Sequence, residues 1–271
     1  MEQQTTRRGA KPERLSSVAN AIRLIKSFAD DDYEIGISAL AIRLGLAKST
    51  VHRLATTLLE AGLLEQNPVS GRYRLGLLMF ELGSLVRRKI DIYTEAKPWL
   101  MKLRDQTGET IRLAVLGHGS AVYINILESP KAVRMALGIG QPLPVHSTAE
   151  GKVLLAFRPP EFIERSIEAG LVQRTAQTIV DPATLREQLA VVRARGYATD
   201  DEECEPGVRG IAAPVRDDSG NVAAALGIAG PIQRLSKRSL MALAPTLIEA
   251  SKAISRRLGD RSRASEPLRS A

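Results

Sequence analysis

Residues 38–62 have the sequence SALAIRLGLAKSTVHRLATTLLEAG, which predicts a short helix, a tight turn and a longer helix. The first helix is expected over residues 38–44 and ends at Gly45, a residue type that favours helix ends. The second helix is expected over residues 49–61. Its apolar side chains recur at helical spacing: Val51, Leu54, Ala55 and Leu58. Two helices of these lengths around a tight turn indicate a helix-turn-helix.

The opposite face of the longer helix carries the groups that a major groove of duplex DNA accepts. These are Lys48, Ser49, Thr50, His52, Arg53 and Thr57. Hydroxyl groups can bond phosphates or base edges, and Arg53 can hold a guanine through two hydrogen bonds or contact a phosphate. The alternative interpretation is a structural three-helix domain whose basic face is simply solvated.

A hairpin is predicted directly after this helix. Two short strand-like segments, residues 63–66 and 72–75, flank the turn sequence NPVSG. Arg72 and Arg74 on the second segment are placed to reach flanking phosphates or the minor groove. The helices and the hairpin together predict a winged helix-turn-helix that binds double-stranded DNA.

The net charge of +8 is concentrated at the two ends of the chain. The first 75 residues have a net charge of +3 and the last 20 a net charge of +4, so the segment between them is near neutral at +1. Basic ends suit a polyanionic partner, although they also serve solubility. Aromatic residues make up 4% of the chain, which argues against single-strand binding by base stacking.

Other sequence features exclude several classes of protein. One cysteine, Cys204, excludes an intrachain disulfide framework and favours a reducing compartment. The N-terminus has no apolar signal segment, and no apolar run is long enough to span a membrane. We therefore expect a cytoplasmic protein without a membrane partner.

The chain is predicted to contain two domains with flexible ends. We expect a disordered arm over residues 1–13, the winged helix-turn-helix over 14–76, a linker helix over 77–89, a second domain over 90–258 and a disordered tail over 259–271. In the second domain, strands joined by hairpins and helices gathered at the ends predict an antiparallel α+β fold. A strand is expected over residues 135–138 and one long helix over residues 236–258.

No catalytic or metal-binding group stands out. Residues 200–205 (DDEECE) are acidic, and a metal site there is the less favoured interpretation; only Asp200 is expected to face a pocket. The neighbouring acids are expected to raise the pKa of Cys204. His146 is expected to be a capping or core residue, with a role as a base left as the alternative. Enzymatic turnover and a protein-binding adaptor remain competing hypotheses, and steep salt dependence would distinguish DNA binding from the adaptor.

Several segments, in order, resemble the IclR family of bacterial transcription regulators. They are residues 15–29 (LSSVANAIRLIKSFA), 46–62 (LAKSTVHRLATTLLEAG), 73–83 (YRLGLLMFELG), 143–156 (LPVHSTAEGKVLLA), 196–203 (GYATDDEE), 211–215 (IAAPV) and 230–231 (GP). The resemblance implies a winged helix-turn-helix, a linker helix and a GAF-like effector-binding domain. It also implies a homodimer or homotetramer on a pseudo-palindromic operator, no cofactor and no enzyme activity. Family members mostly repress, and some activate, genes for the catabolism of small organic, aromatic or sugar acids.

The resemblance also implies an effector pocket. Carried over by motif, its residues are Met135, Leu143, Ala149, Glu150, Asp200, Val208, Gly210, Gly227 and Ala229. The helix that starts near residue 148 would offer free N–H groups to a carboxylate. Relative to the glyoxylate-responsive members, a cysteine near Gly210 is absent, Gly227 and Ala229 replace serines, and Glu150 replaces a small residue. We therefore expect a roomier pocket and a larger or more apolar ligand, with Glu150 facing solvent rather than repelling an anion from inside.

Overall fold

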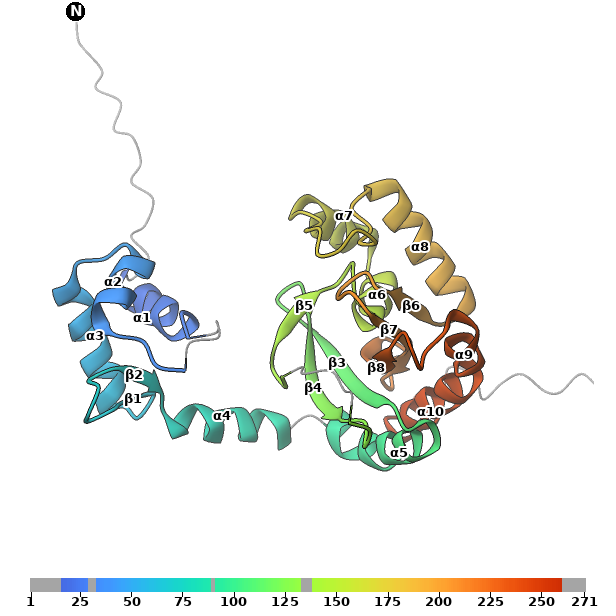
Figure 1. Ribbon diagram of the computed structural model, residues 1–271, viewed down its shortest axis with the longest axis horizontal. Coiled ribbons are helices and arrows are strands. Elements are labelled where there is room, and N and C mark those ends of the chain that lie inside the picture. The colour runs from blue at the N-terminus through green and yellow to red at the C-terminus, as the bar shows by residue number, and fades with distance from the viewer. Residues whose placement is uncertain (1–15, 29–32, 89–90, 133–137, 260–271) are drawn as a thin grey trace, which may run out of the picture. The chain divides into compact units, whose positions relative to one another are not determined.

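The computed structural model describes residues 16–28, 33–88, 91–132 and 138–259, and the chain divides into two units, residues 1–87 and 88–271 (Figure 1). Each unit has its own hydrophobic core. Within the described residues, no helix has the length and apolar content needed to cross a membrane.

The N-terminal unit is a winged helix-turn-helix, as predicted. Its elements are α1 (Ser16–Lys26), α2 (Ile37–Leu44), α3 (Lys48–Glu60), β1 (Leu64–Gln66), β2 (Tyr73–Leu75) and α4 (Leu77–Arg88). Gly45 ends α2 in the left-handed conformation, with φ of 65°, which a side chain would resist. The buried stripe of α3, Val51, Ala55 and Leu58, joins Leu24 and Leu40 in one apolar cluster. Burial of this stripe leaves the polar face of α3 outside.

The C-terminal unit is built around one antiparallel sheet, as expected for an α+β fold. Its strands are β3 (Thr110–Gly117), β4 (Ser120–Leu127), β5 (Pro142–Pro144), β6 (Ala198–Asp201), β7 (Val208–Arg216) and β8 (Val222–Pro231), in the order β5-β4-β3-β8-β7-β6. Its helices are α5 (Asp91–Thr107), α6 (Ala149–Ala156), α7 (Pro160–Glu168), α8 (Pro182–Arg195), α9 (Lys237–Ala242) and α10 (Ala244–Arg257).

Helices cover both faces of this sheet (Figure 1). Leu226 and Ile228 of β8 join α5 and α10 on one face. The alternate positions of β8, among them Ala225 and Gly227, are small and face α6 on the other. Because α6 lies between this small-residue face and α8, all eight of its residues are buried. The sequence pattern of α6 alone gives no sign of such complete burial.

One predicted element of the C-terminal unit is not tested by the structure, and another differs from it. Residues 133–137, which include most of the strand expected over 135–138, lie outside the described residues, and the next strand along the chain is β5. The long helix expected over 236–258 is two helices, α9 and α10, with Leu243 between them. Pro245 lies in the first turn of α10, where its missing N–H costs nothing, but it cannot continue a helix from α9.

Candidate functional site

The polar face of α3 is open to solvent. Each of its candidate DNA-contacting residues is exposed or half-buried, with the hydroxyls and cations of the first turns outward: Lys48, Ser49, Thr50, His52, Arg53 and Thr57. The side chain of Thr57 donates a hydrogen bond to the carbonyl oxygen of Arg53 at 3.1 Å, which leaves its own lone pairs available. Hydroxyls and cations in the first turns of one exposed helix are the arrangement that groove binding requires.

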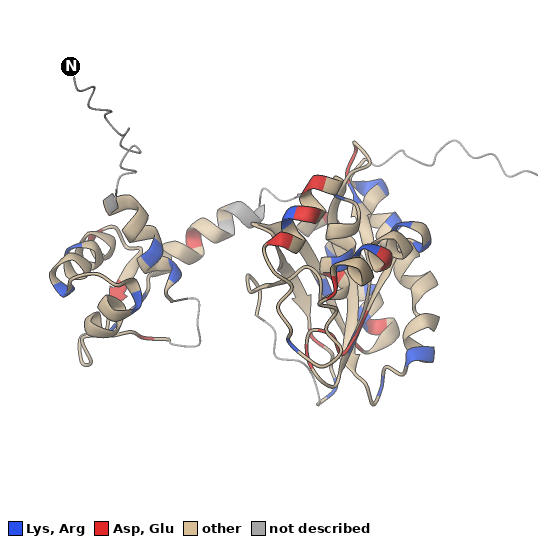
Figure 2. Cartoon of the chain, turned by 90° about the horizontal axis from the view of Figure 1, so that it is seen from above, with Lys and Arg blue, Asp and Glu red and all other residues tan. Residues whose placement is uncertain are grey.

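The two arginines of the wing differ in their partners. Arg72 is exposed in the turn between β1 and β2. Arg74 lies opposite Glu65 in the β1–β2 register and contacts its carboxylate at 2.9 Å, with Glu34 at 3.7 Å. By contrast, within the described part of the chain neither Arg53 nor Arg72 forms an ion pair with a carboxylate. Figure 2 marks the Lys and Arg positions along the helices and the wing. Arg72 is therefore better placed than Arg74 to meet a phosphate.

Most of the candidate effector residues lie on the α6-facing side of the sheet. Pairing of the strands sets Asp200 opposite Gly210 and Gly210 opposite Ala229, while Gly227 is opposite Arg112. Ala149 and Glu150 form the first turn of α6, which Thr148 caps by accepting a hydrogen bond from the N–H of Gly151 at 3.0 Å. These candidates therefore lie close together, around Arg112 on the α6 side of the sheet.

Of the other three candidate effector residues, two are described by the structure. Leu143 on β5 is buried in the apolar cluster of the α6 face, and Val208 is half-buried at the start of β7. Met135 lies outside the described residues. Leu143 also lines an open pocket of about 680 Å³ with His146, Phe162 and Arg174. His146 is buried, and burial lowers the pKa of its imidazole, whose Nε2 lies 3.1 Å from the carbonyl oxygen of Val172.

Glu150 faces the interior, so the expectation that it faces solvent was wrong. Its side chain is 0% exposed, and its two oxygens lie 2.8 Å and 3.1 Å from Nε and Nη2 of Arg112, which is also buried. The hydroxyl of Tyr123 donates a third hydrogen bond at 3.3 Å. Burial acts most strongly and lowers the pKa of Arg112, but Glu150, Tyr123 and Asp200 together outweigh it and hold that pKa above its usual value. The two groups form a buried, doubly hydrogen-bonded ion pair.

The Glu150 carboxylate occupies the space that the small residue at 227 leaves open. A Cβ added to Gly227 would lie 1.9 Å from Glu150 Oε1, and one added to Gly210 would lie 3.0 Å from Arg112 Nη2. The expectation of a roomier pocket at Gly227 was therefore wrong. The glycine and the glutamate are coupled, because Glu150 fits only where residue 227 has no side chain.

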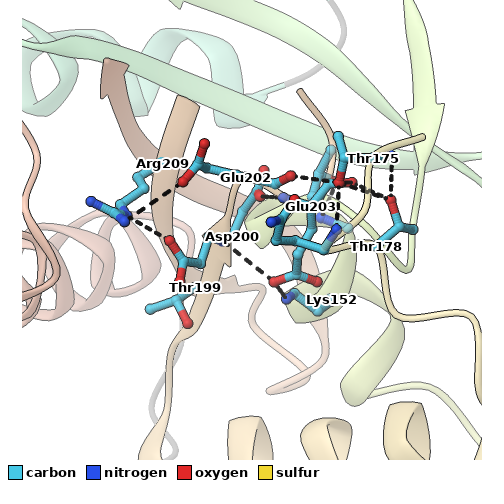
Figure 3. Close-up of polar contacts among 12 residues, drawn as sticks. Lys152, Thr175, Thr178, Thr199, Asp200, Glu202, Glu203 and Arg209 are labelled. Carbon is cyan, nitrogen blue, oxygen red and sulfur yellow. Dashed lines mark hydrogen bonds and ion pairs between the residues drawn. The ribbon is translucent and has the colours of Figure 1, made fainter. Parts of the chain in front are cut away.

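The acidic loop contributes two buried carboxyl groups, where the sequence predicted only Asp200. Burial raises the pKa of Asp200 to about 7. Glu203 is also buried, and its Oε1 lies 2.5 Å from Nζ of Lys152 on α6 (Figure 3). Its Oε2 has no hydrogen-bond partner among the described residues. The hydroxyl of Ser147 lies beside the thiol of Cys204 and acts to lower its pKa. Buried polar atoms in native proteins are almost always paired, so Oε2 of Glu203 is an exception.

Two other acids of the loop, Asp201 and Glu202, pair with Arg209 near the surface. Asp201 contacts Arg209 at 2.5 Å. Glu202 lies 3.7 Å from the same guanidinium (Figure 3). Burial is the main cause that raises the pKa of the Cys204 thiol, and the nearby Asp200 carboxyl group is the second. The sequence predicted this direction but assigned it to the neighbouring acids rather than to burial. Among the described residues, no group of three His, Cys, Asp or Glu is arranged to hold a metal ion.

Sequence reasoning missed Arg112, Tyr123, Lys152 and Glu203 as members of this site. Only Arg112 carried a usable indication, because it interrupts an apolar strand, TIRLAVLG, that is buried on both faces. A charge in such a strand needs a buried partner. Nothing local identifies that partner, since Glu150 is 38 residues away.

Comparison with known proteins gives the same two-part division. The IclR helix-turn-helix domain matches residues 17–68, and the bacterial transcriptional regulator IclR C-terminal domain matches residues 85–256. The HTH-type transcriptional regulator XynR of Escherichia coli is 37% identical over 90% of this chain and 98% of its own length. The transcriptional repressor IclR of Escherichia coli is 31% identical over 92% of this chain and 94% of its own length.

Solved structures extend the likeness to the fold. An IclR homologue from Microbacterium hydrocarbonoxydans, crystallised with 4-hydroxybenzoate, superposes with a TM-score of 0.76 at 30% identity and covers 89% of this chain and 98% of its own. The relatives are transcriptional regulators rather than enzymes.

Proposed function

The chain belongs to the IclR family of DNA-binding bacterial transcriptional regulators, and from this premise we propose that it is a repressor whose affinity for its operator is controlled by a small metabolite. The metabolite, an organic acid or an aromatic compound, binds on the α6 side of the sheet. A regulator of this kind works in the cytoplasm, where the chromosome is. The repressor assignment follows the IclR relative, which is named a repressor.

The exposed polar face of α3 is the observation that supports DNA binding most strongly. The other face of the same helix is fully buried at Val51 and Ala55, so α3 cannot rotate to hide its polar groups. Lys48 and Arg53 therefore remain available to phosphates and base edges.

The proposed ligand site rests on the cluster of candidate residues around Arg112. A relative of the same fold was crystallised with 4-hydroxybenzoate, a small aromatic acid, which supports a ligand of this size and charge. Arg112 and the first turn of α6 are the groups of the cluster that suit an acid.

We further propose that the protein acts as a homodimer or homotetramer on a pseudo-palindromic operator. Among the described side chains of helix α4, Leu77, Phe80, Leu82 and Leu85 are exposed and apolar, which supports burial of this helix against a second copy. Two-fold symmetry would place the half-sites about 34–36 Å apart, or a multiple of that distance.

Selection from a random-sequence duplex pool tests the proposal, because the operator sequence emerges from the selection itself. The wild-type chain is expected to enrich a palindromic sequence and to bind it with a steep dependence on salt. Lys252→Ala, which removes an exposed cation of α10, serves as the matched control and should bind normally. Failure to enrich any duplex sequence at low salt would contradict the proposal.

The sign of regulation needs a separate measurement. A promoter carrying the selected operator is expected to drive less of a reporter when the chain is present. An increase in reporter output would show an activator with the same architecture.

A further inference from the structure

Arg112 is a cation buried in the middle of an apolar sheet. It is 3% exposed, and the strand register sets it between Gly227 on β8 and Ile126 on β4, with Ala114 next on its own face of β3. An unpaired guanidinium among such neighbours would be very unfavourable, so the fold requires a carboxylate or another oxyanion beside it. Gly227 and Ala114 leave room for that anion because they carry almost no side chain.

The anion beside Arg112 is a side chain of the protein itself, Glu150. Glu150 is the second residue of α6, in the turn whose N–H groups have no partner within the helix. It makes three side-chain hydrogen bonds, all to Arg112 and Tyr123. In the described structure these two residues are the hydrogen-bond partners that hold its carboxylate.

A second buried ion pair lies on the same helix. Nζ of Lys152, two residues after Glu150, donates a hydrogen bond to Oε1 of Glu203. Lys152 therefore has a carboxylate partner of its own, so Arg112 is the cation that Glu150 neutralises.

We propose that Arg112 is a carboxylate-binding site whose occupant in this structure is the chain's own Glu150, and that an organic-acid effector binds by taking the place of Glu150 on Arg112. This inference rests on the proposed function for the identity of the ligand as an effector. The exchange leaves Arg112 paired throughout, so it avoids the penalty of a bare buried cation. Glu150 then sets the selectivity of the site, because a ligand without an anionic group cannot replace it.

The experiment uses Glu150→Ala, which removes a group the size of acetate and keeps Cβ. We expect the variant to unfold at a lower temperature than the wild type. Acetate should raise the midpoint temperature of thermal unfolding of the variant by about 3 °C or more, once the acetate concentration exceeds the Kd of acetate about tenfold. Acetamide, which has the same shape without the charge, should give no comparable rise. Equal ionic strength is kept with chloride, and the wild type should respond little, because Glu150 competes.

Two further variants keep the proposal open to refutation. Arg112→Met with Glu150→Ala removes the cation together with its partner, so acetate should no longer raise the midpoint. If Glu150→Ala does not fold, Glu150→Gln keeps the side-chain volume without the charge. Acetate should then stabilise Glu150→Gln more than the wild type.

Three results would overturn the proposal. They are an equal response to acetate and acetamide, an acetate response that survives loss of Arg112, and a wild-type response as large as that of the variant. All are measured on the chain without DNA. A failure here therefore leaves the DNA-binding proposal standing, and a failure of operator selection leaves the carboxylate site standing.

Discussion

Removal of Arg112 alone is expected to destabilise the C-terminal unit strongly. Arg112→Met leaves the Glu150 carboxylate, which is 0% exposed, with only the Tyr123 hydroxyl at 3.3 Å. Breaking one side of a buried ion pair costs about 3–5 kcal/mol, because the remaining charge stays desolvated. At about 2–4 °C per kcal/mol for a unit of this size, the midpoint of thermal unfolding should fall by roughly 6–20 °C.

The fluorescence of Trp99 measures this loss in the correct unit. The chain has one tryptophan, and it lies on α5, against the core cluster that joins the sheet to α5 and α10. Arg112→Met with Glu150→Met replaces the pair with apolar groups of similar length and should recover most of the loss. The reasoning is refuted if Arg112→Met costs less than about 1 kcal/mol, or if the two substitutions are additive, since a coupled pair cannot be additive.

Three other predictions concern the DNA face, the acidic loop and the glycine. Arg53→Ala should weaken operator binding by about 1–3 kcal/mol if Arg53 holds a base, measured by fluorescence anisotropy; unchanged affinity and sequence preference would remove Arg53 from the interface. Because burial raises the pKa of Asp200 to about 7, stability should fall as pH rises from about 4 to about 7. Asp200→Asn should make this decline in stability, followed by Trp99 fluorescence, smaller; the part due to Glu203, whose pKa burial also raises, should remain. An unaltered pH profile would contradict the prediction. Gly227→Ala should cost about 1–3 kcal/mol by overpacking against Glu150, but little in a Glu150→Ala background; an equal cost in both would show that the two positions are independent.

The architecture was largely predictable because its determinants are local. Gly45 and the spacing of Val51, Ala55 and Leu58 predicted the helix-turn-helix, and the structure confirms it with α3 one residue earlier at each end. The long helix expected over residues 236–258 was wrong at Pro245, because periodicity outweighed the proline in that prediction.

The interior of the ligand site was not predictable for a different reason. Glu150 is a charged residue in the first turn of a helix, where exposure is the usual outcome. Its burial depends on the sheet register that sets Gly227 opposite Arg112 and on α8 covering α6 from the other side. Neither of these is visible in the residues around position 150.

Crosslinking from α3 tests the central claim most directly. A photoreactive group on Ser49→Cys, in a Cys204→Ser background that removes the single native cysteine, would lie at the start of α3. The account predicts efficient crosslinking to the selected duplex at defined base positions, and none from the same group on Lys252→Cys. Crosslinking from Ser49→Cys no stronger than from Lys252→Cys would mean that the polar face of α3 does not contact DNA.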